Sequence, residues 1–371
     1  MDETFEIFLA CAPGLEPLLA AEVAEAGWHG AAVPGGVTIT GGWPDVWRAN
    51  LDLRGATRVL ARIGSFRAMH LAQLDKRARK FDWGAVLRPD VPVRVDTVCR
   101  ASRIYHAGAA SQRVGRAISE TLGALVVEKA DPAAITLKVR IEDDLVTISV
   151  DTSGESLHKR GHKAAVSKAP MRETLAALFL RDCGFDGAEP VLDPMCGSGT
   201  FVIEAADIAA GLQPGRARDF AFQRLVTADE TAFAALRRPD PARQPAARFH
   251  GSDRDAGAVK AAAQNAERAG VGAWCDFRMR PVSALERPEG PPGLVIVNPP
   301  YGTRIGDKGP LFGLHAALGK TLLEKFSGWR VGLVTSEGGL ARATGLPLLP
   351  PGAVVDHGGI KVRLYRTDPL P

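Results

Sequence analysis

An asparagine, two prolines and a tyrosine, Asn298-Pro299-Pro300-Tyr301, directly follow the apolar run 294–297. The prolines fix φ and remove two backbone donors, so the groups left at this turn are acceptors: the Asn298 side-chain oxygen and the Pro299 carbonyl. Two such acceptors hold both hydrogens of a planar NH2 group and free its nitrogen lone pair for attack. Tyr301 can stack on the ring that carries the amine. The stretch therefore predicts a site that activates an exocyclic amine of a nucleobase.

Residues 193–200 have the composition of a turn that leads from a buried strand into a helix and faces a ligand. Gly197 and Gly199 permit positive φ and let a ligand approach the backbone, and the amides of the first helical turn point towards that ligand. The stretch lacks the Gly-Lys-Ser/Thr of a phosphate loop, and the acid at its start suits a cationic ligand better than a pyrophosphate. Its residues are Asp193, Pro194, Met195, Cys196, Gly197, Ser198, Gly199 and Thr200.

A third candidate, Asp253, ends the strand-like run 247–253. A carboxylate at the end of a second strand can accept both hydroxyls of a ribose, while Asp255 is placed to cap a helix over 256–268. In a simple dinucleotide-binding fold the acid follows the glycines by about 20 residues. Here the interval is more than 50 residues, which disfavours a nicotinamide oxidoreductase.

Residues 193–200 resemble motif I of class I S-adenosylmethionine-dependent methyltransferases, and residues 298–306 resemble motif IV of amino-methyltransferases with the extension found in the guanine-N2 RNA family. Together with residues 12–16, 50–60 and 102–106, they make nearly the whole chain similar to bacterial 23S rRNA guanine-N2 methyltransferases of the single-methyltransferase-domain form. The resemblance implies S-adenosylmethionine as cofactor, no metal, and catalysis by Asn298, Pro299, Pro300 and Tyr301. The cofactor-binding residues that it implies are Pro170, Glu173, Asp193, Pro194, Met195, Cys196, Gly197, Ser198, Gly199, Thr200, Asp253, Arg254, Ser283 and Asn298.

The sequence departs from the family pattern at two places. Relatives carry an aspartate near the adenine amino group, where this chain has Ser283, and Asp276 comes too early to replace it. The family's Arg-Gly-Tyr-Arg is Arg160-Gly161-His162-Lys163 here. Recognition of the adenine and the role of the missing tyrosine therefore depend on other side chains.

The elements that must position these residues alternate as strands and helices, which is typical of an α/β protein with a doubly wound parallel sheet. We expect a Rossmann-like class I methyltransferase domain over residues 157–371. Strand, helix, strand, helix and strand patterns over residues 1–65 predict a small α+β domain of ferredoxin-like type. The resemblance implies a THUMP domain, an RNA-binding module, over residues 66–156. Residues 211–248 read as a loop insertion with one helix at 231–237.

The segment from Arg67 to Arg116 carries eleven Lys or Arg side chains against four Asp. Such a concentration of positive charge indicates a partner with a phosphate backbone, although a solvated helix face would have the same composition. The predicted RNA contacts, with one more from the catalytic domain, are Arg67, Lys76, Arg77, Arg79, Lys80, Arg100, Arg103, Arg113 and Arg304.

The chain has 371 residues, a formal net charge of +4, 46% hydrophobic residues and five cysteines. No two cysteines have the Cys-x-x-Cys spacing, so neither a disulfide framework nor a structural zinc site is favoured, and a reducing compartment fits best. No basic leader and no apolar run of about 18 residues is present, which predicts a cytoplasmic protein. The sequence gives no oligomeric state.

We therefore expect methyl transfer from S-adenosylmethionine to N2 of a guanine in structured RNA, with 23S rRNA as the partner. Three alternatives stay open. The amine site fits tRNA guanine-N2 and adenine-N6 equally well, and the substitution at Ser283 is compatible with a non-catalytic RNA-binding assembly factor.

Overall fold

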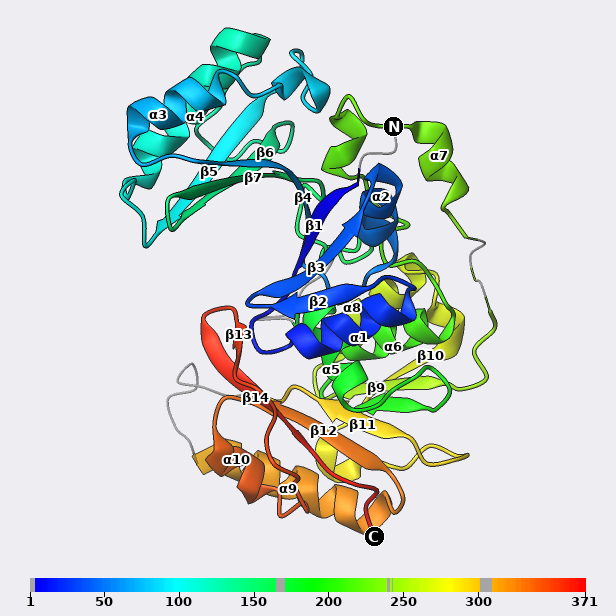
Figure 1. Cartoon of the computed structure of the whole chain (residues 1–371). Coiled ribbons are helices and arrows are strands. Elements are labelled where there is room, and N and C mark those ends of the chain that lie inside the picture. The colour runs from blue at the N-terminus through cyan, green and yellow to red at the C-terminus, as the bar shows by residue number, and fades with distance from the viewer. Residues whose placement is uncertain (1–3, 165–170, 239–240, 242, 301–308) are drawn as a thin grey trace. The chain divides into compact units, whose positions relative to one another are not determined.

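The computed structural model describes residues 4–164, 171–238, 241, 243–300 and 309–371. The chain divides into two compact units, and neither is continuous in sequence (Figure 1). The first unit comprises Met1–Cys11, Glu22–Leu157 and Arg218–Arg237, and the second comprises Ala12–Ala21, His158–Ala217 and Arg238–Pro371. No helix in the described part of the chain has the length and apolar character needed to cross a membrane.

A single seven-stranded sheet runs through the first unit, in the order β2-β3-β1-β4-β7-β6-β5. The long strand β4 (Arg58–Arg67) joins its two halves, because its first residues pair with β1 and the rest of its length pairs with β7. One sheet therefore serves both regions that the sequence predicts as ferredoxin-like and THUMP domains. The other strands are β1 (Phe5–Ala10), β2 (Gly30–Val33), β3 (Gly36–Gly41), β5 (Val93–Arg100), β6 (Ile135–Glu142) and β7 (Leu145–Asp151).

Two helices, α3 (Leu71–Ala78) and α4 (Ala107–Leu122), lie over one face of the β5–β6–β7 half of this sheet (Figure 1). Helix α4 buries Ala110, Val114 and Ile118, whose spacing places them on one side of a helix. It ends at Gly123, which has φ of 80°, a conformation that glycine adopts without a steric penalty. The other helices of the N-terminal region are α1 (Glu16–Glu25) and α2 (Trp43–Asp52).

The second unit contains another seven-stranded sheet, in the order β10-β9-β8-β11-β12-β14-β13. The first five strands are parallel, and β14 pairs antiparallel with β12 and with β13. The predicted doubly wound fold is thus confirmed. The strands are β8 (Val191–Asp193), β9 (Phe249–Asp253), β10 (Cys275–Met279), β11 (Leu294–Val297), β12 (Arg330–Thr335), β13 (Val355–His357) and β14 (Ile360–Arg366).

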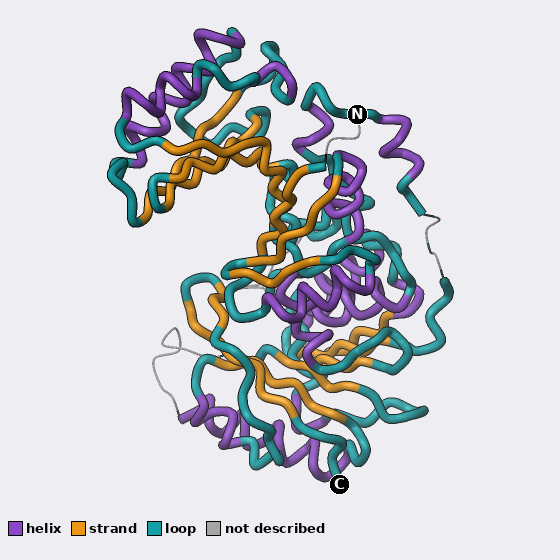
Figure 2. The backbone as a smooth tube through the Cα atoms, viewed as in Figure 1, coloured by secondary structure: helices purple, strands orange, loops and turns teal. Residues whose placement is uncertain are grey.

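Helices cover both faces of this sheet (Figures 1 and 2). On one side Leu318 and Leu322 of α9, with Phe326 directly after the helix, pack with strand residues such as Val297 and Val331 in a continuous core. The central strand β11 is buried on both faces and is apolar throughout, as expected for a parallel strand between two helical layers. The helices are α5 (Glu173–Asp182), α6 (Thr200–Ala209) and α8 (Ala256–Arg268) on one face, and α9 (Gly309–Lys325) and α10 (Gly338–Ala343) on the other.

The insertion that the sequence places in the catalytic domain has its middle part in the first unit. Phe222 donates its amide to Thr152 at 3.0 Å, and its ring packs 6.3 Å from the ring of Trp47. Arg218 binds the carbonyls of Ser153, Glu155 and Ser156. The predicted helix of this segment is α7 (Glu230–Ala235).

Candidate active site

The two strongest sequence motifs follow two neighbouring strands. Strands β8 and β11 are parallel, with Val191 opposite Leu294 and Leu192 opposite Val295. Asp193 ends the first strand, and Asn298 directly follows the second. Because carboxyl ends of parallel strands meet at one edge of a sheet, the two motifs share the edge at which ligands bind in this architecture.

The glycine turn between β8 and α6 has the backbone conformation predicted for it. Gly197 and Gly199 have φ of 51° and 87°. A Cβ atom at Gly199 would lie 3.0 Å from Cβ of Ala262 and 3.1 Å from Cδ1 of Ile203. Glycine is therefore required here by conformation and by close packing, and the helix begins directly behind the turn.

Asp253 ties this turn to the end of β9. One of its carboxylate oxygens accepts the amide of Gly197 and the other accepts the amide of Asp255, each at 3.0 Å. A carboxylate can accept about four hydrogen bonds in all, so capacity for two hydroxyls remains. Asp255 accepts the amide of Gly257 at 2.8 Å, which confirms its role as the N-cap of α8.

Asp193 lies at the bottom of the site and is almost completely buried. Its Oδ1 accepts the amide of Met195 at 3.0 Å. Burial, with a further contribution from the charge of Asp253, raises the pKa of Asp193 to about 8. The carboxyl is therefore largely protonated at neutral pH and ionises when a cation lies beside it.

We expect Asp193→Asn to remove a pH dependence from the free energy of unfolding. The pKa of an unfolded aspartate is about 3.9 and that of Asp193 in the fold is about 8. A raised pKa in the folded state stabilises the fold at low pH, and this contribution is lost as the pH rises from about 4 to about 8. Over that window the unfolding free energy of the native chain should fall relative to that of the variant, by at most about 1.4 kcal/mol per pH unit.

Urea unfolding of the two proteins at several pH values between 4 and 8 measures this difference. Every other titrating group is common to both chains, so the difference isolates Asp193. A difference that stays constant across the window would contradict the raised pKa.

Asn298 presents an acceptor that the described part of the chain leaves unused. Its side-chain Oδ1 is buried, and no hydrogen-bond partner lies near it among the described residues. A buried polar atom without a partner costs free energy and commonly marks a ligand site. Pro299 behind it is buried and Pro300 is exposed. The predicted residues Tyr301, Arg304 and Pro170 lie outside the described residues.

Lys163, the last residue of the stretch 160–163 that departs from the family pattern, was not among the predicted site residues. Its ammonium donates to Oγ1 of Thr200 at 2.7 Å and pairs with Glu173 at 3.0 Å. It thus joins the predicted cofactor residue Glu173 to the first residue of α6. A small gap beside this cluster is lined by His162, Lys163, Glu173, Thr200, Ile203 and Glu204.

Two observations bear on the departures from the family pattern. Ser283 is exposed, whereas Met279, whose side chain is 65% exposed, stands opposite Asp253 in the pairing of β10 with β9. An exposed apolar side chain at this edge is a surface on which a flat ring can pack. His162, in place of the tyrosine, is buried, and burial lowers its pKa so that the ring is neutral.

The family model of the RMKL-like methyltransferase domain matches residues 160–346, about half of the chain. The chain belongs to the RMKL-like methyltransferase family. The RlmL ferredoxin-like domain matches residues 6–60. Both matches confirm the resemblance that the sequence motifs indicated.

A curated relative of this RMKL-like methyltransferase, the ribosomal RNA large subunit methyltransferase K/L of Chromohalobacter salexigens, is 36% identical over 362 residues. The alignment covers 92% of this chain and 49% of the relative, so the chain spans about half the length of the curated relative. Two solved structures share the whole fold. They are a possible methylase from Clostridium difficile 630 (28% identity, TM-score 0.88, 100% of this chain and 99% of that chain) and SMU.472, a putative methyltransferase complexed with SAH (25% identity, TM-score 0.86, 100% of each chain).

In this RMKL-like methyltransferase the predicted RNA contacts of the first unit divide between two surfaces. Lys76, Arg77 and Lys80 are exposed on or directly after α3. Arg79 is engaged by Asp75 and Glu120, and these hydrogen bonds raise its pKa. Arg113 is exposed on α4, whereas Arg67 and Arg100 end strands β4 and β5, and Arg103 follows β5.

Proposed function

We propose that this chain transfers a methyl group from S-adenosylmethionine to the exocyclic N2 amine of a guanine in structured RNA, with 23S rRNA as the substrate. The observation that carries the proposal is the buried Oδ1 of Asn298 at the carboxyl end of β11, to which none of the described residues hydrogen-bonds. An orphaned acceptor in a rigid turn is suited to a donor that arrives with the substrate. An exocyclic amine of a base is such a donor.

The residues at the edge of the sheet fit the proposed cofactor. The glycine turn has the positive φ that lets its amides face a ligand, and the free acceptor capacity of Asp253 suits the ribose hydroxyls. Asp193 changes from a neutral to a charged carboxyl when a cation approaches it. When bound, the cofactor supplies an electrophilic methyl group on a sulfonium.

The role of the protein in the reaction is to position the amine. Asn298 accepts one amine hydrogen through Oδ1, and the carbonyl of Pro299 accepts the other. Holding the two hydrogens out of the base plane turns the nitrogen lone pair towards the methyl carbon. After transfer the amine nitrogen carries a positive charge and loses a proton to water, so no strong base is needed beforehand.

The first unit supports an RNA substrate in this proposal. Residues 66–156 would form the THUMP domain, between a ferredoxin-like domain over 1–65 and the methyltransferase domain over 157–371, and its exposed basic side chains would contact phosphates. The name of the curated relative specifies ribosomal RNA of the large subunit. A cytoplasmic location is part of the proposal, because ribosomal RNA of a bacterium is modified there.

Nucleoside mass spectrometry of separated rRNA and tRNA, from cells with and without the gene, tests the proposal. We expect N2-methylguanosine to disappear from one position of the large-subunit RNA. Loss of N2-methylguanosine from tRNA instead would identify tRNA as the substrate. Loss of N6-methyladenosine would identify adenine as the methylated base. A full set of modifications in both fractions, with no cofactor binding by the purified chain, would favour the non-catalytic assembly factor.

A further inference from the structure

The β4-β7-β6-β5 half of the first sheet has one covered face and one open face. Alternate residues of the strands lie on the side of α3 and α4. Buried examples are Thr97 of β5, Val139 of β6 and Ile148 of β7, which lie in one row across the sheet. Ser111 of α4 donates to Thr97 at 2.9 Å, which identifies the covered face. Because side chains alternate along a strand, the intervening residues belong to the opposite face.

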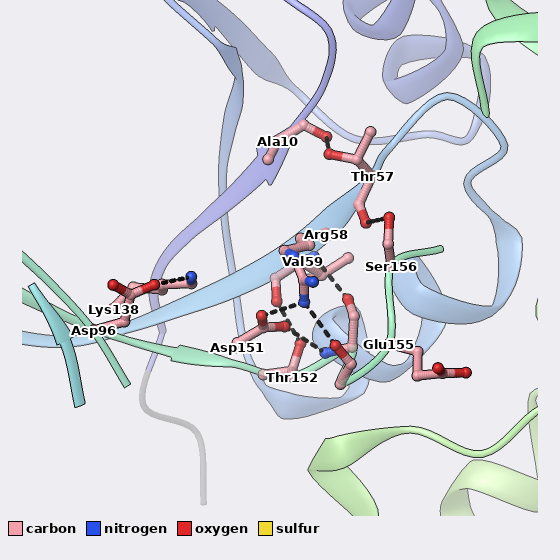
Figure 3. A network of polar contacts seen from close by, with 12 residues as sticks. Ala10, Thr57, Arg58, Val59, Asp96, Lys138, Asp151, Thr152, Glu155 and Ser156 are labelled. Atoms are coloured by element: carbon pink, nitrogen blue, oxygen red, sulfur yellow. Dashed lines mark hydrogen bonds and ion pairs between the residues drawn. The ribbon is translucent and has the colours of Figure 1, made fainter. Parts of the chain in front are cut away.

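The open face carries a marked excess of positive charge. The register places Asp96, Lys138, Ser149 and Arg62 in one row, and Arg100, Glu142, Leu145 and Arg67 in another. Lys138 pairs with Asp96 at 2.6 Å, and these two side chains meet in Figure 3. Seven basic residues, Arg58, Arg62, Arg67, Arg94, Arg100, Lys138 and Arg140, thus share the face with the acids Asp96, Glu142 and Asp151, and Asp151 pairs with Arg58.

The fold balances only part of the charge on this face. Arg62 pairs with Glu6 of the neighbouring strand β1, whereas Arg100 and Arg140 share one acid. Arg140 pairs with Glu142 at 2.6 Å, and the same acid is the only one within 4 Å of Arg100 in the described chain, at 3.7 Å. Burial, and in addition the charge of Arg140, lowers the pKa of Arg62, so like charges lie close enough to repel. Arg100 and Arg140 remain 75% and 58% exposed. Repulsion among exposed arginines is relieved by an anionic partner.

We propose that this open sheet face binds the phosphate backbone of the substrate RNA. The inference rests on the proposed function and narrows its RNA contacts to one surface. No aromatic side chain lies on the open face of these four fully described strands. On the neighbouring strand β1 the ring of Phe8, which is on the same side, lies against the guanidinium of Arg62. The four strands themselves offer no ring that could stack an unpaired base, so their contacts are electrostatic and independent of sequence.

The sequence has its contiguous basic residues at α3, and among the cations of the open face it predicted only Arg67 and Arg100 as RNA contacts. The open face draws on strands β4, β5 and β6, and Lys138 and Arg140 lie outside the basic segment 67–116. Both surfaces offer three exposed cations that can be neutralised without touching the core. They are Arg67, Arg100 and Arg140 on the sheet, and Lys76, Arg77 and Lys80 at α3.

The test compares two full-length triple variants. The sheet variant combines Arg67→Gln, Arg100→Gln and Arg140→Gln, and the α3 variant combines Lys76→Gln, Arg77→Gln and Lys80→Gln. Binding of labelled 23S rRNA transcript is measured between about 50 and 200 mM salt, the range over which phosphate contacts weaken steeply. Each lost contact lowers the slope of log K against log salt by about 0.7–0.9. We expect the sheet variant to lose about two to three in slope and the α3 variant to lose less than one. Melting temperatures equal to that of the native chain exclude misfolding.

The opposite result, with a loss only in the α3 variant, would overturn the inference, as would an unchanged slope in the sheet variant. Methyl transfer by the native chain to the same transcript is measured in parallel. If it is present while the sheet variant keeps its slope, the inference fails and the proposed function stands. If the native chain neither methylates nor binds any RNA, the proposed function fails and the inference falls with it.

Discussion

Replacing Asn298 by alanine should lower the rate of methyl transfer by about 10²–10³-fold, the typical cost of removing one preorganised hydrogen-bonding group from a reacting centre. Its Oδ1 is buried, and none of the described residues hydrogen-bonds to it. The fold therefore loses little when the side chain is removed, and the substrate amine loses an acceptor. Affinity for S-adenosylmethionine should change little, because the glycine turn and Asp253 lie on other strands.

Single-turnover transfer to RNA and calorimetric binding of the cofactor separate the two effects. Asn298→Asp is the matched control, since it keeps an acceptor oxygen at the same position, and it should retain more activity than the alanine variant. Turnover at the native rate in Asn298→Ala would refute the role of this residue in positioning the amine. Loss of cofactor binding together with turnover would assign it to the cofactor instead.

Replacing Asp253 by alanine should weaken cofactor binding by about 10- to 100-fold, the equivalent of one or two charge-assisted hydrogen bonds. The carboxylate has a second role, because it accepts the amides of Gly197 and Asp255 and so holds the glycine turn at the end of β9. Both losses act in the same direction on affinity. Cofactor titration measured by calorimetry gives the change directly.

Asp255→Ala is the control for this experiment. It removes a carboxylate two residues away that caps α8 through Gly257. Loss of such a cap costs about 1 kcal/mol of stability, with cofactor affinity nearly unchanged. Equal losses of affinity in both variants would show that the end of β9 acts only by supporting the backbone.

Local signals in the sequence accounted for most of the catalytic unit. Helix α8 was predicted with its cap at Asp255, and β11 coincides with the apolar run 294–297. Strand β2 was missed, since Gly30–Val33 is largely exposed, shows no alternation, and forms only by pairing with β3. The formation of β2 depends on the edge that β3 offers for pairing, and not on the pattern of its own residues.

The parts that escaped prediction depend on residues distant in sequence. Lys163 joins the site through Glu173 and Thr200, which no spacing rule connects. Arg79 looked like a phosphate contact, yet Glu120, 41 residues away, also engages it. Likewise, a basic segment read along the chain cannot show which of its residues share a sheet face. That information lies in the register of β4, β5, β6 and β7.

The interleaving of the two units bears on how the protein is made. The ribosome releases residues in order, and N-terminal domains generally fold first during synthesis. When residue 157 has emerged, the first unit still lacks two residues that complete it. Phe222 packs on Trp47, and Arg218 binds the carbonyl of Ser153. The first unit is complete only after residue 237, by which point the glycine turn of the second unit has also been synthesised. The folding of the two units during synthesis is therefore coupled. A gene divided at residue 157 would yield neither unit complete, because each unit contains residues from both sides of that position.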